Sequence, residues 1–250
     1  MTKQFEGKTA IVTGGGSGIG KAVALGLAAG GASVVVNDLE QKVAQAVVDE
    51  LAGKGGAGLA VAGDVGKPDD VKALVDAAVK KYGALHLAFN NAGISGPQGL
   101  TADVDIEGYL KLMDVNLHSV FYGMHYEIPA MLKAGGGSIV NTSSILGLVG
   151  DGALVPYVAA KHGVAGMTKA TALGYADKGI RVNSVHPGYI DTPLLDALPR
   201  ETYDGLVAKH PIGRLGTSEE VAEVVLFLLS DKAAFVTGSQ CLVDGAYTTL

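Results

Sequence analysis

The stretch TAIVTGGGSGIG, Thr9 to Gly20, places five glycines within eight residues directly after a short apolar run. The segment that follows, KAVALGLAAGG, has the apolar periodicity of a helix. Glycines in such a turn let backbone N–H groups approach a phosphate with no Cβ in the way, and the helix N-terminus adds partial positive charge. The stretch therefore predicts a strand, a dinucleotide-binding turn and a helix, although a plain tight turn gives the same pattern.

The same alternation of apolar runs and helical segments continues along the whole chain. Runs rich in β-branched residues occupy 9–13, 33–37, 59–63, 85–91, 137–144, 180–187 and 239–244. Helical periodicity occupies 18–29, 40–54, 67–81, 103–133, 156–178 and 217–230. Because the strands are almost entirely apolar, we expect parallel strands buried on both faces. The sequence predicts an α/β fold, a Rossmann-like doubly wound parallel sheet of seven strands with helices on both faces.

No proline-rich or serine-rich linker and no block of charge divides the chain, so residues 1–250 are predicted to form a single dinucleotide-binding and catalytic domain. Residues 188–216 are too irregular for the alternation. Such an excursion beyond the carboxyl end of a strand is where α/β proteins place substrate contacts. We therefore predict that 188–216 is a substrate loop.

Composition argues against several classes of function. A net charge of -6 disfavours binding to nucleic acid or to an anionic membrane surface. Cys241 is the only cysteine, which excludes an intrachain disulfide and suits a reducing compartment. The longest apolar run, 22–36, is too short to span a bilayer, and the first residues lack a signal-peptide pattern. We expect a cytoplasmic protein.

Asp38 ends the second predicted strand, eighteen residues after Gly20. A carboxylate at this place accepts hydrogen bonds from the ribose hydroxyls of a dinucleotide and repels a 2′-phosphate. Because Leu39 rather than a basic residue follows it, the sequence favours NAD over NADP. Asp38 with Gln41 also resembles a helix-capping box, and the two interpretations are compatible.

Tyr157 and Lys161 stand four residues apart on a predicted helix and therefore on one face. A tyrosine with its ordinary pKa near 10 is a poor base at neutral pH. An ammonium group ~4 Å away supplies about 4 kcal/mol at an effective dielectric near 20, which lowers the pKa by roughly 3. The pair is thus a candidate general base, although two exposed side chains four residues apart on a helix are the ordinary explanation of this spacing.

Several motifs together resemble the short-chain dehydrogenase/reductase family over essentially the whole chain, from Gly7 to Gly245. In the order and spacing of that family stand TGGGSGIG (13–20), NNAG (90–93), Asn116, SS (143–144), YVAAK (157–161) and HPG (186–188).

The resemblance assigns roles to the residues that could react. It implies that Tyr157 is the catalytic acid and base, and that Lys161 lowers its pKa and binds the nicotinamide ribose. Ser144, thirteen residues before Tyr157, is implied to hold and polarise the substrate oxygen, whereas Ser143 is expected to be a strand-end residue. Asn116 resembles the family asparagine that holds a water molecule linking the lysine to solvent.

The resemblance also implies a set of cofactor contacts. It implies that Gly14, Ser17, Gly18, Ile19 and Gly20 bind the pyrophosphate and adenosine half of the cofactor. It also implies that the adenine contacts Asp64 and Val65, and that Asn91, Ala92 and Gly93 flank the adenine ribose. The nicotinamide falls to Pro187, Gly188, Ile190 and Thr192. His86 departs from the family, where many members have aspartate, and we expect it to be structural.

The expected substrate surroundings are mostly aliphatic. The candidates for this lining are Ile94, Ile145, Leu146, Leu148, Val149, Leu154, Tyr189, Leu194, Leu195 and Leu198. The nearest basic residues, Arg200, Lys209 and Arg214, come late in the loop, so we predict a neutral, fairly apolar secondary alcohol or ketone as the small-molecule substrate. No metal site is expected, since His118 and His125 lack a carboxylate pattern around them.

Helix 156–178 has small or apolar residues on nearly every side, which predicts cover by a second subunit in a homotetramer or homodimer. Three other functions remain open at this point. A 3-ketoacyl-thioester reductase of the same family usually favours NADPH and carries basic residues for a carrier, and an enoyl reductase spaces its tyrosine and lysine more widely. A dinucleotide-sensing protein has no need of the Ser144, Tyr157, Lys161 and Asn116 set.

Overall fold

The computed structural model describes residues 3–192 and 199–249, so the predicted lining residues Leu194, Leu195 and Leu198 lie outside the described residues. The central strands are β1 (Thr9–Thr13), β2 (Ser33–Asp38), β3 (Ala57–Ala62), β4 (Leu87–Asn90), β5 (Gly137–Thr142), β6 (Ile180–Pro187) and β9 (Gln240–Val243). They form a parallel sheet of seven strands in the order β3-β2-β1-β4-β5-β6-β9. The predicted fold class is confirmed.

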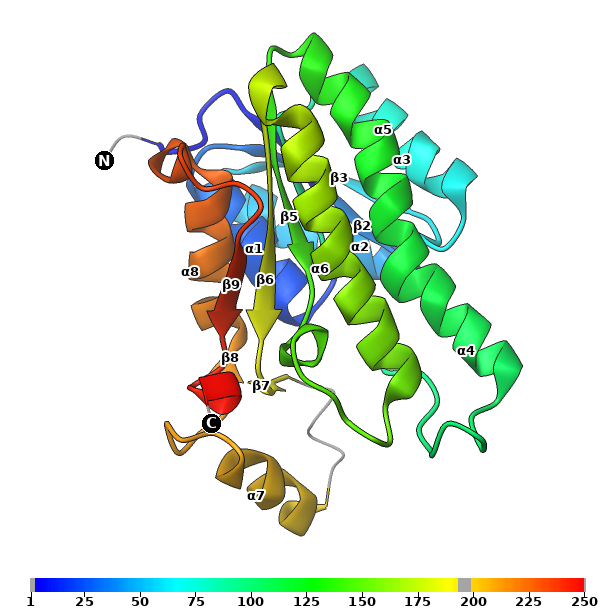
Figure 1. The fold of residues 1–250 in the computed structure, drawn as a ribbon. Coiled ribbons are helices and arrows are strands. Elements are labelled where there is room, and N and C mark those ends of the chain that lie inside the picture. The colour runs from blue at the N-terminus through cyan, green and yellow to red at the C-terminus, as the bar shows by residue number, and fades with distance from the viewer. Residues whose placement is uncertain (1–2, 193–198, 250) are drawn as a thin grey trace.

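Helices cover both faces of the sheet (Figure 1). One face carries α1 (Gly18–Ala29), α2 (Gln41–Gly53) and α8 (Ser218–Leu229), and the other carries α3 (Pro68–Tyr82), α5 (Ser119–Lys133) and α6 (Val155–Tyr175). Strand β1 shows why its sequence is a continuous apolar run. Val12 belongs to the core under α1, whereas Ile11 belongs to the core under α3 and α5, and both are fully buried.

The strand order reverses between β1 and β4, which lie side by side in the middle of the sheet. In open α/β sheets such a switch point opens a crevice at the carboxyl ends of the strands, and ligands bind there. The glycine-rich turn leaves β1 at this point. The fold therefore places the predicted phosphate-binding turn where a dinucleotide is expected.

The predicted helix 103–133 is interrupted. Its described form consists of α4 (Ile106–Met113), a π-helical turn over Asp114–His118, and α5. Asp105 caps the start of α4 by accepting a hydrogen bond from the Gly108 N–H. A π-turn is an irregularity found frequently at functional sites, and this one contains Asn116.

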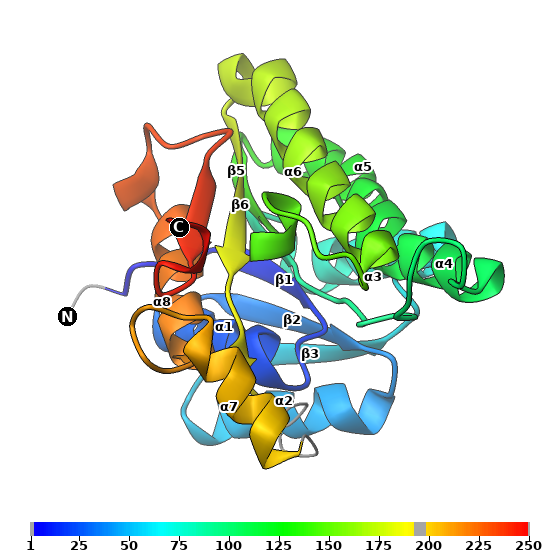
Figure 2. The same cartoon turned by 60° about the horizontal axis from the view of Figure 1, so that its bottom comes forward.

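The excursion at 188–216 is more regular than expected. It contains α7 (Arg200–Ala208) and a two-stranded ladder of β7 (Ile190–Asp191) with β8 (Gly216–Thr217). Helix α7 buries none of its residues, so it lacks the apolar stripe by which a helix is recognised in a sequence. It lies beyond the carboxyl ends of the central strands (Figures 1 and 2), and its role as a substrate loop stays a prediction.

Candidate active site and dinucleotide site

The glycine-rich turn is shaped by close backbone approaches. Gly14 has a φ of 58°, and a Cβ on it would lie 2.9 Å from the Cα of Ala92. A Cβ on Gly20 would collide with the carbonyl oxygen of Gly14. Side chains at these two positions would therefore move the turn away from β4 or away from the start of α1.

The backbone at the start of α1 is suited to binding a phosphate group. No side chain caps the helix at Ser17, and its first turn carries no acidic residue. Gly18 has a φ of 50°, and a Cβ on it would be in van der Waals contact with the Cγ2 of Thr192, 3.6 Å away. The start of α1 thus has no side-chain cap on its backbone N–H groups, as phosphate binding at a helix N-terminus requires.

Asp38 is tied to the turn rather than to a helix cap. Its Oδ2 accepts a hydrogen bond from the Gly16 N–H at 3.0 Å, and its Oδ1 accepts one from the Leu39 N–H at 2.9 Å. Helix α2 begins after Glu40, and Gln41 instead pairs its side-chain amide with the backbone of β3. The capping-box interpretation of Asp38 and Gln41 is therefore wrong.

Thr13 is a residue of this site that sequence reasoning missed. Its hydroxyl oxygen accepts hydrogen bonds from the Asn91 N–H at 2.9 Å and from the Ala92 N–H at 3.1 Å. The Asn91 amide donates in return to the carbonyl of Thr13 at 3.2 Å. These bonds fasten the NNAG segment after β4 to the end of β1, and Gly93 follows directly. A lone threonine at a strand end carries no spacing signal that could have revealed this role.

Asp64 and Val65 follow β3 on the same edge of the sheet. Asp64 accepts a hydrogen bond from the Gly66 N–H at 3.0 Å and lies 3.4 Å from the Lys111 ammonium. Burial pushes its pKa up, but these two partners outweigh burial and the pKa is lowered. The carboxylate is thus ionised and held by the protein, and the adenine contact stays a prediction.

Ser144, Tyr157 and Lys161 are brought together where β5 ends and α6 begins. Lys161 is buried, and its ammonium donates to the carbonyl of Thr142 at 2.8 Å while lying 5.5 Å from the centre of the Tyr157 ring. The Ser144 hydroxyl accepts a hydrogen bond from the Leu146 N–H at 3.1 Å, and it lies near enough to the Tyr157 phenol to influence the pKa of that phenol. The ammonium, the phenol and the aliphatic hydroxyl thus lie together at the carboxyl edge of the sheet, which is where ligands bind in open α/β folds.

The electrostatics of this cluster differ from the expectation for an isolated Tyr–Lys pair. Burial raises the pKa of Tyr157, and the nearby Ser144 hydroxyl opposes this increase without overcoming it. Burial also lowers the pKa of Lys161 to about 8. The chain by itself therefore does not lower the pKa of the tyrosine, because desolvation disfavours both charged forms.

Asn116 uses its side chain to hold the loop after β4. Its amide oxygen accepts from the Ile94 N–H and its amide nitrogen donates to the Ile94 carbonyl, each at 2.8 Å. Asn116 is fully buried, whereas Ile94 is 39% exposed. The π-turn thus fixes one wall of the predicted substrate site, a function that sequence reasoning did not assign. The water-mediated link to Lys161 stays a prediction.

The segment after β6 faces the glycine-rich turn. A Cβ on Gly188 would lie 2.7 Å from His210 Nε2 and 3.1 Å from the Cα of Asp244, so the chain needs glycine there. Pro187 ends β6, and Ile190 is buried in the core under α1. Thr192 lies across from Gly18. The structure thus brings the predicted nicotinamide segment close to the predicted phosphate turn at Thr192 and Gly18.

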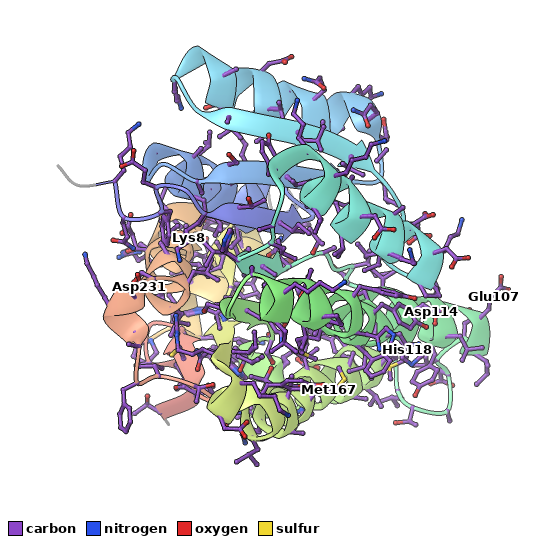
Figure 3. The ribbon with its side chains drawn as sticks, turned by 90° about the horizontal axis from the view of Figure 1, so that it is seen from above. Lys8, Glu107, Asp114, His118, Met167 and Asp231 are labelled. Carbon is purple, nitrogen blue, oxygen red and sulfur yellow. The ribbon has the colours of Figure 1, made fainter. Side chains whose placement is uncertain are left out.

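The remaining predicted polar residues lie elsewhere. His118 pairs with Asp114 at 2.9 Å on the helix surface (Figure 3), and the His162 ring contacts the carbonyl of Val158. His86 accepts a hydrogen bond from the Thr9 N–H at the amino-terminal edge of the sheet, in agreement with a structural role. In residues 3–192 and 199–249 no group of three or more histidine, cysteine or acidic side chains is arranged to hold a metal ion. No helix in this part of the chain is long and apolar enough to cross a membrane.

Comparison with known proteins gives full-length matches. A family model described as enoyl-(acyl carrier protein) reductase matches residues 14–248. The chain is 59% identical over 249 residues to cyclohexanol dehydrogenase of Acinetobacter sp. (strain SE19), covering 100% of this chain and 98% of that protein. It is 43% identical over 250 residues to cis-4-hydroxycyclohexanecarboxylate dehydrogenase of Sinomonas cyclohexanicum, covering 100% of both. The solved structure of levodione reductase superposes with a TM-score of 0.94 at 35% identity, over 98% of this chain and 99% of that one.

The matches extend from the glycine-rich turn to the end of β9 and therefore include every motif discussed above. The sheet order and the flanking helices agree with the solved relative across almost the whole chain. The chain belongs to the short-chain dehydrogenase/reductase family.

Proposed function

We propose that the protein interconverts a cyclic secondary alcohol and its ketone with NAD as the hydride carrier. The observation that carries this proposal is the cluster of Ser144, Tyr157 and Lys161 at the carboxyl edge of the sheet, the edge at which the glycine-rich turn also leaves β1. The identity of 59% to a cyclohexanol dehydrogenase over the whole chain supports oxidoreduction of a secondary alcohol or ketone. The second relative, also named for a hydroxylated cyclohexane ring, supports a six-membered ring as the substrate framework.

Each residue of the cluster has a chemical role in this proposal. NAD, when bound, would supply a nicotinamide carbon that accepts or returns the hydride. Tyr157 takes the proton from the alcohol oxygen during oxidation and returns it during reduction. Ser144 holds that oxygen by a hydrogen bond, and the positive charge of Lys161 stabilises the phenolate. Asn116 keeps the Ile94 wall in place beside them.

The charges around the site support a neutral substrate. Arg200 is paired with Asp204 at 3.0 Å, and Arg214 makes two short bonds to Glu220. Lys209 lies 6.0 Å from the centre of the Tyr189 ring. Two of the three basic groups that could bind an acyl carrier are thus already engaged within the chain, which makes the 3-ketoacyl-thioester reductase the weaker candidate.

A substrate panel tests the proposal. We expect cyclohexanol with NAD to give reduced nicotinamide, followed by its near-ultraviolet absorbance, and cyclohexanone to oxidise NADH. Open-chain secondary alcohols should react more slowly, and primary alcohols slowest. Preference for an acetoacetyl thioester with NADPH would support the 3-ketoacyl reductase instead. Tight NAD binding with no turnover on any alcohol would support a dinucleotide sensor.

The preference for NAD is expected to depend on the charge of Asp38. The Asp38→Asn variant keeps an acceptor for the Gly16 N–H but removes the charge that repels a 2′-phosphate. We expect the ratio of kcat/KM with NADP to that with NAD to rise at least about tenfold, the size of one lost like-charge contact of about 1.4 kcal/mol. Steady-state kinetics with both cofactors measures this ratio.

Glu40→Gln provides the control for Asp38→Asn, because Glu40 is a neighbouring carboxylate that pairs with Lys42 at the surface. It should leave the cofactor ratio unchanged. An unchanged ratio in Asp38→Asn would show that Asp38 serves only to brace the turn.

A homotetramer or homodimer is proposed from the surface of α5 and α6. Phe121 on α5 is 52% exposed and Leu173 on α6 is 86% exposed, which is unusual for large apolar side chains on a helix pair. We expect sedimentation velocity to give a closed oligomer, and Leu173→Glu to reduce its size by placing a charge in the buried contact. A monomeric wild-type protein at micromolar concentration contradicts this proposal.

A further inference from the structure

We propose that His186 is a positioning residue for Ser144, and that its ring holds the serine backbone so that the hydroxyl stays beside the Tyr157 phenol. The inference deepens the proposed function and rests on it, because it takes Ser144 to act on the substrate oxygen. His186 is fully buried on β6, and the proposed reaction has no direct use for its ring.

The need for such a residue arises where the sheet ends. The Ser143 N–H still pairs with the Val185 carbonyl at 2.9 Å, as the ladder of β5 and β6 continues. At Ser144 the chain leaves the ladder and enters a 3₁₀ turn over Ile145–Gly147. The Ser144 carbonyl accepts from the Gly147 N–H within that turn, at 2.9 Å. The ladder of β5 and β6 ends at Thr142 and Val185, so the contact that β6 makes with Ser144 comes from a side chain.

His186 supplies that contact with a fixed ring orientation. Its Nδ1 lies 2.9 Å from the Ser144 carbonyl oxygen, and its Nε2 lies 2.8 Å from the Ser184 hydroxyl. A carbonyl oxygen only accepts, so Nδ1 carries the proton and donates it to Ser144. Burial lowers the pKa of His186 to about 4, so the ring is neutral and Nε2 accepts from Ser184.

The side chains of Ser184 and His186 lie on the same face of β6. Ser184 and His186 are two residues apart, and side chains at that spacing point to the same side of a strand. The residues that follow, Pro187 and Gly188, begin the predicted nicotinamide segment. His186 therefore links the serine expected to hold the substrate oxygen to the segment expected to hold the nicotinamide, so that the two reacting groups share one rigid support.

Two substitutions of His186 separate the effect of losing the hydrogen bond from Nδ1 from the effect of removing the ring. Asparagine places its amide nitrogen near the position of Nδ1, whereas glutamine places it near the position of Nε2. We expect His186→Asn to keep kcat within about threefold and His186→Gln to lower it by about 10-fold to 100-fold, as displacement of a reacting group by about 1 Å does. The KM for NAD should change less than about twofold in both, since the adenosine half binds elsewhere.

A double-mutant cycle with Ser144→Ala identifies the route of the effect. If His186 acts through Ser144, the loss caused by His186→Gln should shrink to below about twofold once the serine hydroxyl is absent. The control is His86→Gln, a histidine at the opposite edge of the sheet that should leave kcat unchanged. Circular dichroism and the thermal transition establish that each variant is folded.

The outcomes distinguish the two levels of the proposal. Equal losses in His186→Asn and His186→Gln, or an undiminished loss in the Ser144→Ala background, overturn the positioning role. Full activity of Ser144→Ala itself contradicts the assignment of Ser144 in the proposed function. If His186→Gln does not fold, Ser184→Ala replaces it in the cycle, because it removes the donor that fixes the ring, and a loss of about threefold that disappears with Ser144→Ala is expected.

Discussion

The Tyr157→Phe variant should lose turnover while it still binds the dinucleotide. Removing the phenol oxygen removes the group that exchanges a proton with the substrate, and a positioned acid or base contributes about 10²-fold to 10⁴-fold to the rate. We therefore expect kcat/KM to fall at least about 100-fold and the Kd for NADH, from fluorescence titration, to stay within about threefold. The ring remains in place, so the neighbouring ammonium and glycine-rich turn keep their positions.

A second Tyr–Lys pair, formed by the last residue of α6 and the 3₁₀ turn that follows it, provides the control. At the other end of α6, Lys178 lies 4.8 Å from the centre of the Tyr175 ring, a geometry similar to that of Lys161 and Tyr157. Tyr175→Phe should keep the wild-type kcat, because this pair lies away from the carboxyl edge of the sheet. A Tyr157→Phe enzyme with more than about one tenth of the wild-type kcat would contradict the role of Tyr157 as acid and base.

The Lys161→Met variant should be inactive, and its stability should depend on pH differently from that of the wild-type protein. Burial lowers the pKa of Lys161 from its ordinary value of 10.5 to about 8. Between these two values the unfolded chain holds a proton that the folded chain has released, so the wild-type stability rises with pH across this window. Methionine does not titrate, so the stability of Lys161→Met should lack this rise.

The measurement compares the free energies of unfolding by denaturant at several pH values. From pH 8 to 10.5, the stability of wild type relative to Lys161→Met should increase by about 3 kcal/mol, since each pKa unit corresponds to about 1.4 kcal/mol. Below pH 8 the difference should be constant. A difference that is constant over the whole range would show that the ammonium is not desolvated, while kcat/KM in the same samples should be at least about 100-fold below wild type.

Much of the fold could be predicted because its strongest determinants are local. The central strands are short apolar runs, and a parallel strand buried on both faces produces that pattern by itself. The glycine-rich turn was recognisable because its steric needs, at Gly14 and Gly20, permit no other residue. The interrupted helix around Asn116 and the exposed helix α7 were not predicted, since a π-turn preserves apolar character and α7 buries no apolar stripe.

The residues of the candidate site also include some that the sequence predicts and others that it does not. Tyr157, Lys161 and Ser144 stand at fixed spacings, and the structure brings them together as the family resemblance implied. Thr13 and His186 contribute through single hydrogen bonds between distant strands, and a contact of that kind leaves no periodic or spacing signal in one sequence. The pKa of Tyr157 depends on the burial of its phenol as well as on its distance from the ammonium of Lys161, and burial is not visible in a sequence.

The most direct test of the proposed chemistry follows the hydrogen atom itself. Cyclohexanol carrying deuterium on its hydroxyl-bearing carbon is incubated with NAD and the wild-type protein, and the reduced cofactor is analysed by mass spectrometry. We predict one deuterium in each reduced cofactor and none formed with Tyr157→Phe over the same time. Reduced cofactor without deuterium, or no reduced cofactor with any cyclic alcohol, would contradict hydride transfer at this site.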